Sequence, residues 1–256
     1  MGMVGCRWLA KGLAASLAGT EAMRAAQSSK TAFRSTHKRR AIVMKPLWFW
    51  ESSQSASSWF GRVELAAPGE AWPTTDGKPM HPICQINLTE FPFRPSRLED
   101  IEVITIFIGP DGLPIDQSNG MNWCLRTYRK LHDLVHLLPI DTGSNIKPIA
   151  LRPSVISEDY PCFEDVSPGF SGTLPRLYPL LFPNKAGFKF GGWPSLIQSE
   201  IDWATNDEHP IAPEYVFQID SYRRANWYWG DNGVGYFGRG TRTSHLDDWA
   251  VTWQCY

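Results

Sequence analysis

The most conspicuous chemical pattern in the sequence is a set of spaced glycines, Gly233, Gly235 and Gly238, which matches G-x-G-x-x-G. In dinucleotide-binding folds this pattern joins a strand to a helix, and an acidic residue follows about 20 residues later. Here Arg239-Gly240-Thr241 follows, without any helical pattern. We therefore interpret the glycines as relief of crowding on a β-sheet, and we assign no cofactor.

Two groups of histidine and aspartate suggest metal or hydrolytic chemistry. His132 and His136 are four residues apart, so on a helix they would share a face, as in the zinc motif H-E-x-x-H. The sequence shows no third ligand, and we interpret the pair as a solvated helix face. His245, Asp247 and Asp248 lie close together in a loop-like stretch, where local hydrogen bonds are the usual role. We assign no metal and no catalytic residue.

A tight turn is expected at Asp231-Asn232-Gly233. Asn-Gly supplies the positive φ angles that a two-residue type I′ hairpin turn requires. Calcium binding there would need further oxygen ligands at loop spacing, which the sequence lacks. Ser195 follows Trp193-Pro194 outside any G-x-S-x-G pattern, so the usual hydrolase elbow is also missing.

The remaining candidates are polar side chains set among the twelve tryptophans of the chain. Alternation along 226–229 predicts that Trp227 and Trp229 share one face and that Tyr228 lies on the other. Core packing explains most of these aromatic residues, and a concave aromatic pocket with a few polar groups is the alternative interpretation. The predicted ligand-binding residues are Gln85, Asn87, Gln218, Asp220, Trp229, Asp231 and Gln254.

The net charge of −1 is unevenly distributed. Residues 1–43 contain eight basic residues and one acidic residue, which gives +7 and leaves −8 for residues 44–256. An acidic body argues against nucleic acid as the partner, because neutralising phosphates needs clustered lysine and arginine. No apolar run reaches the roughly 18–20 residues of a membrane helix, so we expect a soluble protein with no membrane partner.

Residues 1–43 are rich in alanine, serine and basic residues. This composition is typical of a transit peptide or of a disordered extension, and a start at Met44 is a further alternative. Residues 44–256 are expected to form one domain. The five cysteines form no C-x-x-C pair and are odd in number, which predicts neither a zinc site nor a disulfide framework and favours a reducing, cytoplasmic location.

The body of the chain contains landmarks that recur in one order. Phe60-Gly61 recurs as Phe190-Gly191, and Gln85-Ile86-Asn87 recurs as Gln218-Ile219-Asp220, with an offset that grows only from 130 to 133 residues. This recurrence predicts an internal duplication. The halves are expected at about 44–165 and 187–256, joined by a proline- and glycine-rich connector, and each half is expected to be a small antiparallel unit.

Three elements are expected between the landmarks. Asn122–Tyr128 alternates as a strand does. Lys130–Leu138 has apolar residues at helical spacing and is stopped by Pro139. Lys147–Pro153 is predicted to be an edge strand, because its prolines would break a central ladder.

Several motifs resemble the DUF1963 family, also called YwqG-like, of uncharacterised proteins. They are Trp72-Pro73, Gln85-Ile86-Asn87-Leu88, Glu158-Asp159-Tyr160-Pro161, Phe190-Gly191-Gly192-Trp193-Pro194-Ser195, Phe217-Gln218-Ile219-Asp220-Ser221, Trp229-Gly230-Asp231, Gly235-Tyr236-Phe237 and Trp253-Gln254. One departure is Arg62, where such sequences more often resemble a second glycine. This departure weakens the case for a shared site in the first half.

The resemblance implies a duplicated α+β domain, mainly antiparallel β with a few short helices. It supplies no reaction. We therefore expect a non-catalytic binding or protein-interaction domain whose partner is another protein or a small molecule. The alternative is a hydrolase-type enzyme with its site in the cleft between the two halves, and the sequence leaves open whether the protein is an enzyme.

Overall fold

The computed structural model describes residues 28, 30–47, 57–166, 174–204 and 209–256. It divides the chain into two units, Met1–Lys38 and Arg39–Tyr256. In the first unit residues 30–37 are helical, and the rings of Phe33 and His37 stack at 4.1 Å between centroids. None of the helices in the described ranges is long and apolar enough to span a membrane.

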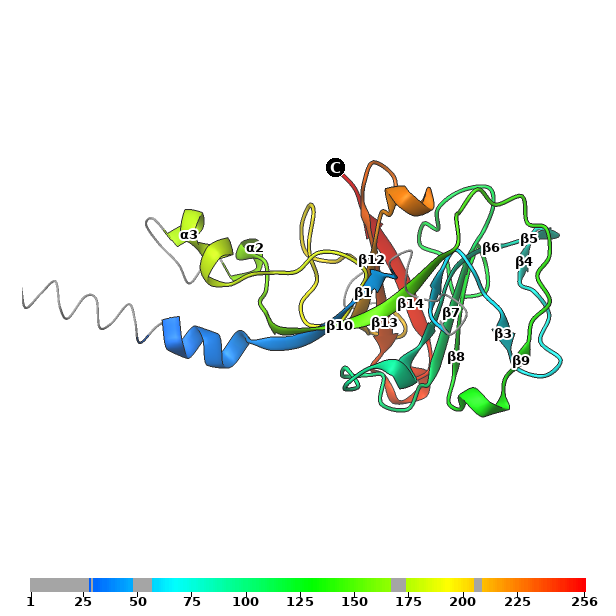
Figure 1. The fold of residues 1–256 in the computed structure, drawn as a ribbon. Helices are drawn as coiled ribbons and strands as arrows, with labels where there is room; N and C mark the ends of the chain where they lie inside the picture. The colour runs from blue at the N-terminus through cyan, green and yellow to red at the C-terminus, as the bar shows by residue number, and fades with distance from the viewer. Residues whose placement is uncertain (1–27, 29, 48–56, 167–173, 205–208) are drawn as a thin grey trace, which may run out of the picture. The chain divides into compact units, whose positions relative to one another are not determined.

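The second unit is built on one ten-stranded sheet in the order β14-β13-β12-β11-β1-β10-β2-β6-β7-β8 (Figure 1). All neighbouring strands are antiparallel. Their bounds are β1 Arg39–Pro46, β2 Trp59–Phe60, β6 His81–Asn87, β7 Val103–Ile108, β8 Trp123–Tyr128, β10 Ile149–Asp159, β11 Lys189–Gly191, β12 Pro213–Asp220, β13 Val234–Gly240 and β14 Trp249–Gln254. The predicted class, mainly antiparallel β, is therefore confirmed.

Shorter elements connect these strands. The two-stranded sheets are β3 Leu65–Ala66 with β9 Val135–His136, and β4 Thr74–Thr75 with β5 Lys78–Pro79. The helices are α2 Phe163–Val166 and α3 Leu174–Leu181, and the 3-10 turns are η2 Leu88–Glu90, η3 Leu131–Asp133, η6 Arg223–Ala225 and η7 Thr243–His245.

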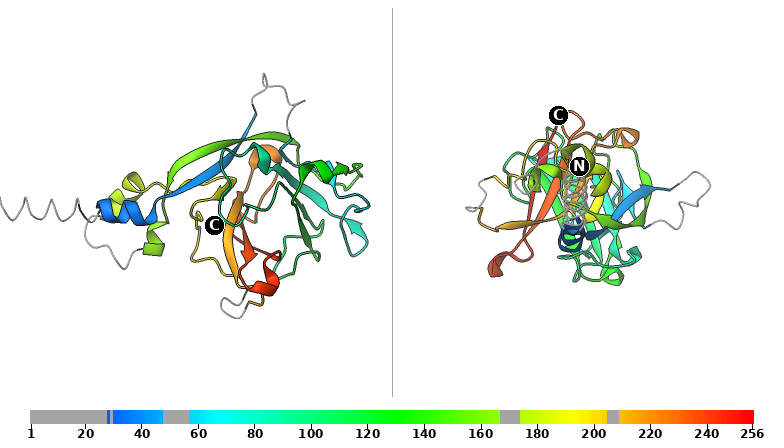
Figure 2. Two further views of the ribbon diagram at one scale, coloured as in Figure 1. Left: turned by 90° about the horizontal axis from the view of Figure 1, so that it is seen from below. Right: turned by 90° about the vertical axis from the view of Figure 1, so that its left-hand side faces the viewer.

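Strand β1 lies in the middle of the sheet, beside β10 (Figures 1 and 2). Ala41, Ile42 and Val43 are buried there and pair with β11 on the other side. The compact unit therefore begins at Arg39, and residues 39–43, which their composition assigns to the N-terminal extension, belong to the sheet. The basic composition of the extension concealed this short apolar strand.

The two ends of the sheet have matching pairings. β11-β12-β13-β14 runs to one edge and β2-β6-β7-β8 to the other, with β1 and β10 between them. The residues paired at the landmarks are Trp59 with Gln85 and Phe60 with Cys84 in the first half, and Lys189 with Gln218 and Phe190 with Phe217 in the second. The recurring sequence landmarks thus occupy equivalent positions in the two halves.

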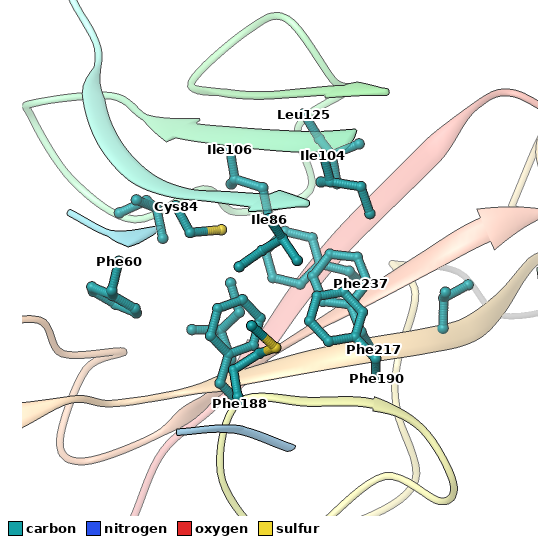
Figure 3. Close-up of a cluster of buried hydrophobic side chains, with 14 of the residues drawn as sticks. Phe60, Cys84, Ile86, Ile104, Ile106, Leu125, Phe188, Phe190, Phe217 and Phe237 are labelled. Atoms are coloured by element: carbon teal, nitrogen blue, oxygen red, sulfur yellow. The ribbon is translucent and has the colours of Figure 1, made fainter. Parts of the chain in front are cut away.

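The core lies between the two ends of the sheet (Figure 3). Phe190, Phe217 and Phe237 form a ladder across β11, β12 and β13, with ring centroids 4.8 and 4.6 Å apart. Ile86 and Ile106, from β6 and β7, belong to the same buried cluster. Each half of the sheet has an apolar face. The sheet folds so that these two faces pack against each other and are buried.

Two predicted elements differ in the structure. Lys130–Leu138 is not a helix: it contains η3 and then β9, which pairs with β3, while Leu138 is 75% exposed. Lys147–Pro153 contributes to β10, which is central rather than at an edge. Among the described strands, β2 pairs only with the first two residues of β10. At Pro153, β10 pairs only with β1, so the missing N–H of the proline can be tolerated there.

Candidate functional site

A buried ion pair joins the end of β10 to the start of β11. Lys189 Nζ lies 3.1 Å from Asp159 Oδ2, and both side chains are 0% exposed. The Asp159 carboxylate also accepts the backbone N–H groups of Lys185 at 2.8 Å and Trp193 at 2.7 Å. Burial lowers the pKa of Lys189, and the nearby Asp159 opposes that shift. Asp159 therefore holds both ends of the segment 185–193, which contains β11.

Ser195 lies against this pair. Its Oγ is 3.3 Å from Lys189 Nζ, 2.5 Å from Asn184 Oδ1 and 3.0 Å from the carbonyl of Lys185. A serine hydroxyl beside a lysine amine is one arrangement used for nucleophilic catalysis. Burial lowers the pKa of Lys189 and so favours the neutral amine that a general base needs, whereas Asp159 favours the charged lysine, so the contact also fits a purely structural role.

Two of the predicted amide residues hold the following segment. Gln218 Oε1 accepts the backbone N–H of Ser195 at 2.8 Å, and its Nε2 donates to Asp220 Oδ1 at 2.8 Å. Gln254 Oε1 accepts the backbone N–H groups of Ile197 and Gln198 at 3.1 and 3.2 Å. Both amides are buried, and both bind the chain itself.

The two predicted amide residues of the first half, Gln85 and Asn87, also bind the chain itself, but at a different place in the fold. Gln85 Oε1 accepts the N–H groups of Glu64 and Leu65 at 2.9 and 3.0 Å. Asn87 Oδ1 accepts the N–H of Thr89 at 3.0 Å and so caps η2. The structure therefore does not bring Gln85 and Asn87 into the hydrogen-bonded network of Gln218 and Asp220.

Trp229 and Asp231 differ in solvent exposure. Trp229 is 0% exposed, and a Cβ on Gly235 would come within 2.4 Å of its ring. A Cβ on Gly238 would similarly meet the ring of Trp203 at 2.7 Å. This confirms that these glycines relieve crowding on the sheet. Asp231 is exposed.

The turn before β13 differs from the expected type. Gly230 and Asn232 have positive φ angles of 55° and 52°, whereas Gly233 does not. The N–H of Gly233 donates to the carbonyl of Trp229 at 2.8 Å. A type I′ turn would need positive φ at both Asn232 and Gly233, so that part of the prediction is wrong. Trp229 packs into the core and sets the course of this loop.

The two histidine motifs lie in separate local structures. His132 lies in η3 and His136 in β9, so they do not share a helical face. His245 Nδ1 is 2.6 Å from Asp248 Oδ2, a local loop contact. Across the described residues, no group of three histidine, cysteine or acidic side chains could hold a metal ion.

Of the predicted residues, Asp220 lines a small cavity between the two halves. The cavity is about 220 Å³ and mostly apolar. Its walls are Val43, Met44, Pro46, Phe60, Leu151, Gly187, Phe188, Asp220, Ser221 and Tyr222. Burial raises the pKa of Asp220, while hydrogen bonds from Gln218 and the backbone of Gly187 oppose that shift. The first half thus contributes a wall to a pocket whose carboxyl group comes from the second.

Lys189 and Asp159 were not among the predicted site residues, although a signal was present. Lys189 stands between Phe188 and Phe190, and a charged residue in a buried strand needs a partner. The partner, Asp159, is 30 positions away in the chain. Spacing alone could not identify it.

The fold and these contacts define a mainly antiparallel β-sheet protein with a buried polar network in its second half. The family model described as "Domain of unknown function (DUF1963)" matches residues 126–255. The chain therefore belongs to this family, as its motifs indicated. The matched range contains the Lys189–Asp159 pair and all five predicted residues of the second half. No curated protein matches the chain.

Proposed function

We propose that this protein is a binding domain that takes a small, largely apolar ligand in the cavity beside Asp220. The observation that carries the proposal is the cavity itself, with apolar walls from both halves and one carboxyl group. Binding sites for small molecules are mostly apolar and use a few polar groups to fix orientation. At about 220 Å³ the cavity suits a ligand the size of one aromatic ring with a short side chain.

The carboxyl group indicates the chemistry of the ligand. Both oxygens of Asp220 already accept one hydrogen bond, from Gln218 Nε2 and from the N–H of Gly187. Each carboxylate oxygen can accept a second. A ligand with an ammonium group or another hydrogen-bond donor would therefore be favoured, and a ligand with a carboxylate would be rejected.

Binding of 2-phenylethylamine to the whole protein, measured by ligand-observed NMR and calorimetry, tests this proposal. The isosteric 3-phenylpropionate is the matched ligand of opposite charge. We expect the amine to bind and the acid not to bind. Asp220→Asn should weaken amine binding about tenfold, because a charge-assisted hydrogen bond is lost.

Two further variants complete the test. Leu151→Phe should block the amine, because the larger side chain fills the cavity. Asp231→Asn is the control, since it removes an exposed aspartate that does not line the cavity. Equal binding of amine and acid, or amine binding that survives both Asp220→Asn and Leu151→Phe, would refute the proposal.

A hydrolase is the second candidate, and the contact between Ser195 Oγ and Lys189 Nζ favours it. Its test is labelling with a fluorophosphonate together with a screen of activated esters. Labelling that disappears in Ser195→Ala would support an enzyme. Absence of both labelling and turnover would leave the contact with a structural role.

The matching strand pairings at the two landmarks support an internal duplication. In the second copy Gln218 donates to Asp220, whereas Gln85 and Asn87 of the first copy bind other segments. A cytoplasmic location, and a partner that is neither nucleic acid nor membrane, remain predictions from composition. Fractionation of cells that express the native protein would test the location.

A further inference from the structure

A second cavity, of about 480 Å³, is lined by residues near the Lys189–Asp159 pair, including Gly191 and Gly192. Four segments form it: the start of β1, the loop that follows η2, the end of β11 and the first half of β12. Its lining residues are Arg39, Arg40, Phe93, Arg94, Pro95, Ser96, Arg97, Gly191, Gly192, Glu214, Tyr215 and Val216. None of them is among the predicted ligand-binding residues.

The lining of this cavity is strongly basic. It contains four guanidinium groups and one carboxylate, that of Glu214. The compact unit around it is acidic: residues 1–38 carry +5 and the whole chain −1, so residues 39–256 carry −6. Like charges close together oppose folding unless an anion neutralises them. A concentrated positive cluster in an acidic body therefore points to an anionic ligand.

Aromatic rings hold two of the arginines in place. The guanidinium of Arg39 lies 3.6 Å from the centroid of Trp193, and that of Arg40 lies 4.0 Å from the centroid of Phe93. Stacking positions a guanidinium by its flat face and leaves the N–H groups at its edge free to bind. Arg39 uses one of them on the carbonyl of Gly192, at 3.3 Å.

The other donors are incompletely used. Within the described ranges, Arg40 and Arg94 have no hydrogen-bond or ion-pair partner. Arg97 Nη2 donates to the carbonyl of Gly240, but its buried Nε has no hydrogen bond. That Nε lies 3.9 Å from Glu214 Oε2. Burial lowers the pKa of Arg39 and of Arg94, although an arginine stays charged at neutral pH. These cations have thus given up part of their hydration without receiving a full set of acceptors.

Bare backbone forms another part of the wall. Gly191 and Gly192 have φ angles of 66° and 67°, which favour glycine. A Cβ at Gly191 would approach Pro95 to 2.9 Å, and a Cβ at Gly192 would approach Asp159 Oδ2 to 2.3 Å. The buried ion pair therefore fixes the position of this backbone, and with it the wall of the cavity.

We propose that this cavity binds a small molecule that carries a phosphate group. Arginines reach it from β1 and from the loop 93–97, so their N–H groups approach from different directions. A tetrahedral phosphate can accept from several directions at once, whereas a carboxylate is planar and is best matched by one guanidinium. The volume exceeds that of phosphate alone and lies in the range of roughly 300–1,000 Å³ that small-molecule sites occupy.

Calorimetric titration of the full chain with pyrophosphate tests this proposal, which is independent of the ligand in the Asp220 cavity. We expect saturable binding that weakens as the salt concentration rises. Arg94→Gln and Arg40→Gln should each weaken it about tenfold, since each removes a charge-assisted hydrogen bond. Glu214→Gln should strengthen it about threefold, because it removes the only acidic group in the lining.

The control is Arg223→Gln, which removes an exposed arginine of η6 that does not line the cavity. We expect it to leave the pyrophosphate affinity within about twofold of that of the wild type. The gain in Glu214→Gln cannot come from misfolding, so this variant keeps the test valid if an arginine variant is unstable. Citrate is the comparison ligand, because it carries only carboxylates.

Three results would overturn the proposal. They are an unchanged pyrophosphate affinity in the Arg94, Arg40 and Glu214 variants, an equal loss in Arg223→Gln, and tighter binding of citrate than of pyrophosphate.

Discussion

Arg239 and Asp100 form a two-point ion pair between β13 and the loop before β7. Arg239 Nη1 lies 2.7 Å from Asp100 Oδ1, and Nη2 lies 2.8 Å from Oδ2. The remaining N–H groups of Arg239 donate to Leu246 O, Arg97 O and Asp247 Oδ1 at 2.6, 2.8 and 2.7 Å. All five guanidinium donors are therefore used, and the two halves of the sheet are joined at this point.

Arg239→Lys should lower the free energy of unfolding by about 1–2 kcal/mol, because an ammonium on this buried side chain cannot make the two-point contact with the partly exposed Asp100. Urea denaturation would measure the change. Arg129→Lys is the matched control: Arg129 also contacts Asp247, at 3.3 Å, but its side chain is 70% exposed. We expect it to cost less than about 0.5 kcal/mol. Equal costs in the two variants would contradict the prediction.

The same pair should contribute to acid sensitivity. The hydrogen bonds from Arg239 lower the pKa of Asp100. Folded protein therefore keeps Asp100 ionised to a lower pH than the unfolded chain does. The stabilisation is complete above about pH 4 and is lost as the pH falls through the lowered pKa. Asp100→Asn should make the free energy of unfolding depend less on pH in that acidic window. Urea titrations at several pH values would measure this, and an unchanged pH dependence would contradict the prediction.

Lys189→Met should destabilise the protein by about 3–5 kcal/mol, because it leaves the Asp159 carboxylate buried without its cation. Adding Asp159→Asn should recover part of this loss, since the charge is then removed as well. Lys185→Met, at an exposed neighbouring position, is the control. Thermal and urea unfolding would measure all three variants. A Lys189→Met protein as stable as the Lys185→Met protein would show that the pair contributes little.

The chain that begins at Arg39 should be as stable as the full chain, whereas the chain that begins at Met44 should not. The shorter chain loses Ala41, Ile42 and Val43, which are buried and supply the entire pairing of β1 with β11. Losing the buried isoleucine and valine alone should cost roughly 4 kcal/mol. Expression yield and the urea midpoint would measure the difference. Equal midpoints would mean that β1 is dispensable.

Amine binding beside Asp220 should depend on pH. Burial raises the pKa of Asp220, so its carboxyl group ionises at a higher pH in the folded protein than in the unfolded chain. Binding of 2-phenylethylamine should therefore strengthen as the pH rises through that raised pKa. Ionisation of the buried group also destabilises the fold over the same rise in pH. Asp220→Asn should remove both effects, and calorimetry with unfolding curves from pH 4 to 8 would test this.

Strand positions were predicted well where the signal was local. The runs at Val103–Ile108, Trp123–Tyr128 and Val234–Phe237 are strands, because alternating or continuous apolar side chains determine which face is buried. The helix expected at Lys130–Leu138 was wrong because it relied on the local pattern alone. Its apolar spacing fits a helix, but a backbone hydrogen bond from Leu137 to Glu64 draws the segment into a strand pairing.

The candidate site was predicted only in part. Gln218 and Gln254 do lie together, but their amides are used by the loop 195–198. Asp220 does line a cavity. Gln85 and Asn87 occupy the equivalent place in the first half and bind other segments there. Recurring landmarks identify similarly paired positions in the sheet, and they do not show which of these positions faces a cavity.

The sequence by itself determined the family, the antiparallel class and the role of the spaced glycines in relieving crowding on a sheet, because each is indicated by residues close together in the chain. Only the tertiary structure decided that Arg39 begins the sheet, that Lys189 pairs with Asp159, and that arginines at 39–40 and 94–97 meet Gly191 around one cavity. These contacts join segments that lie tens of residues apart. Their partners are chosen by how the two ends of the sheet bury their apolar faces, and no local spacing encodes that choice.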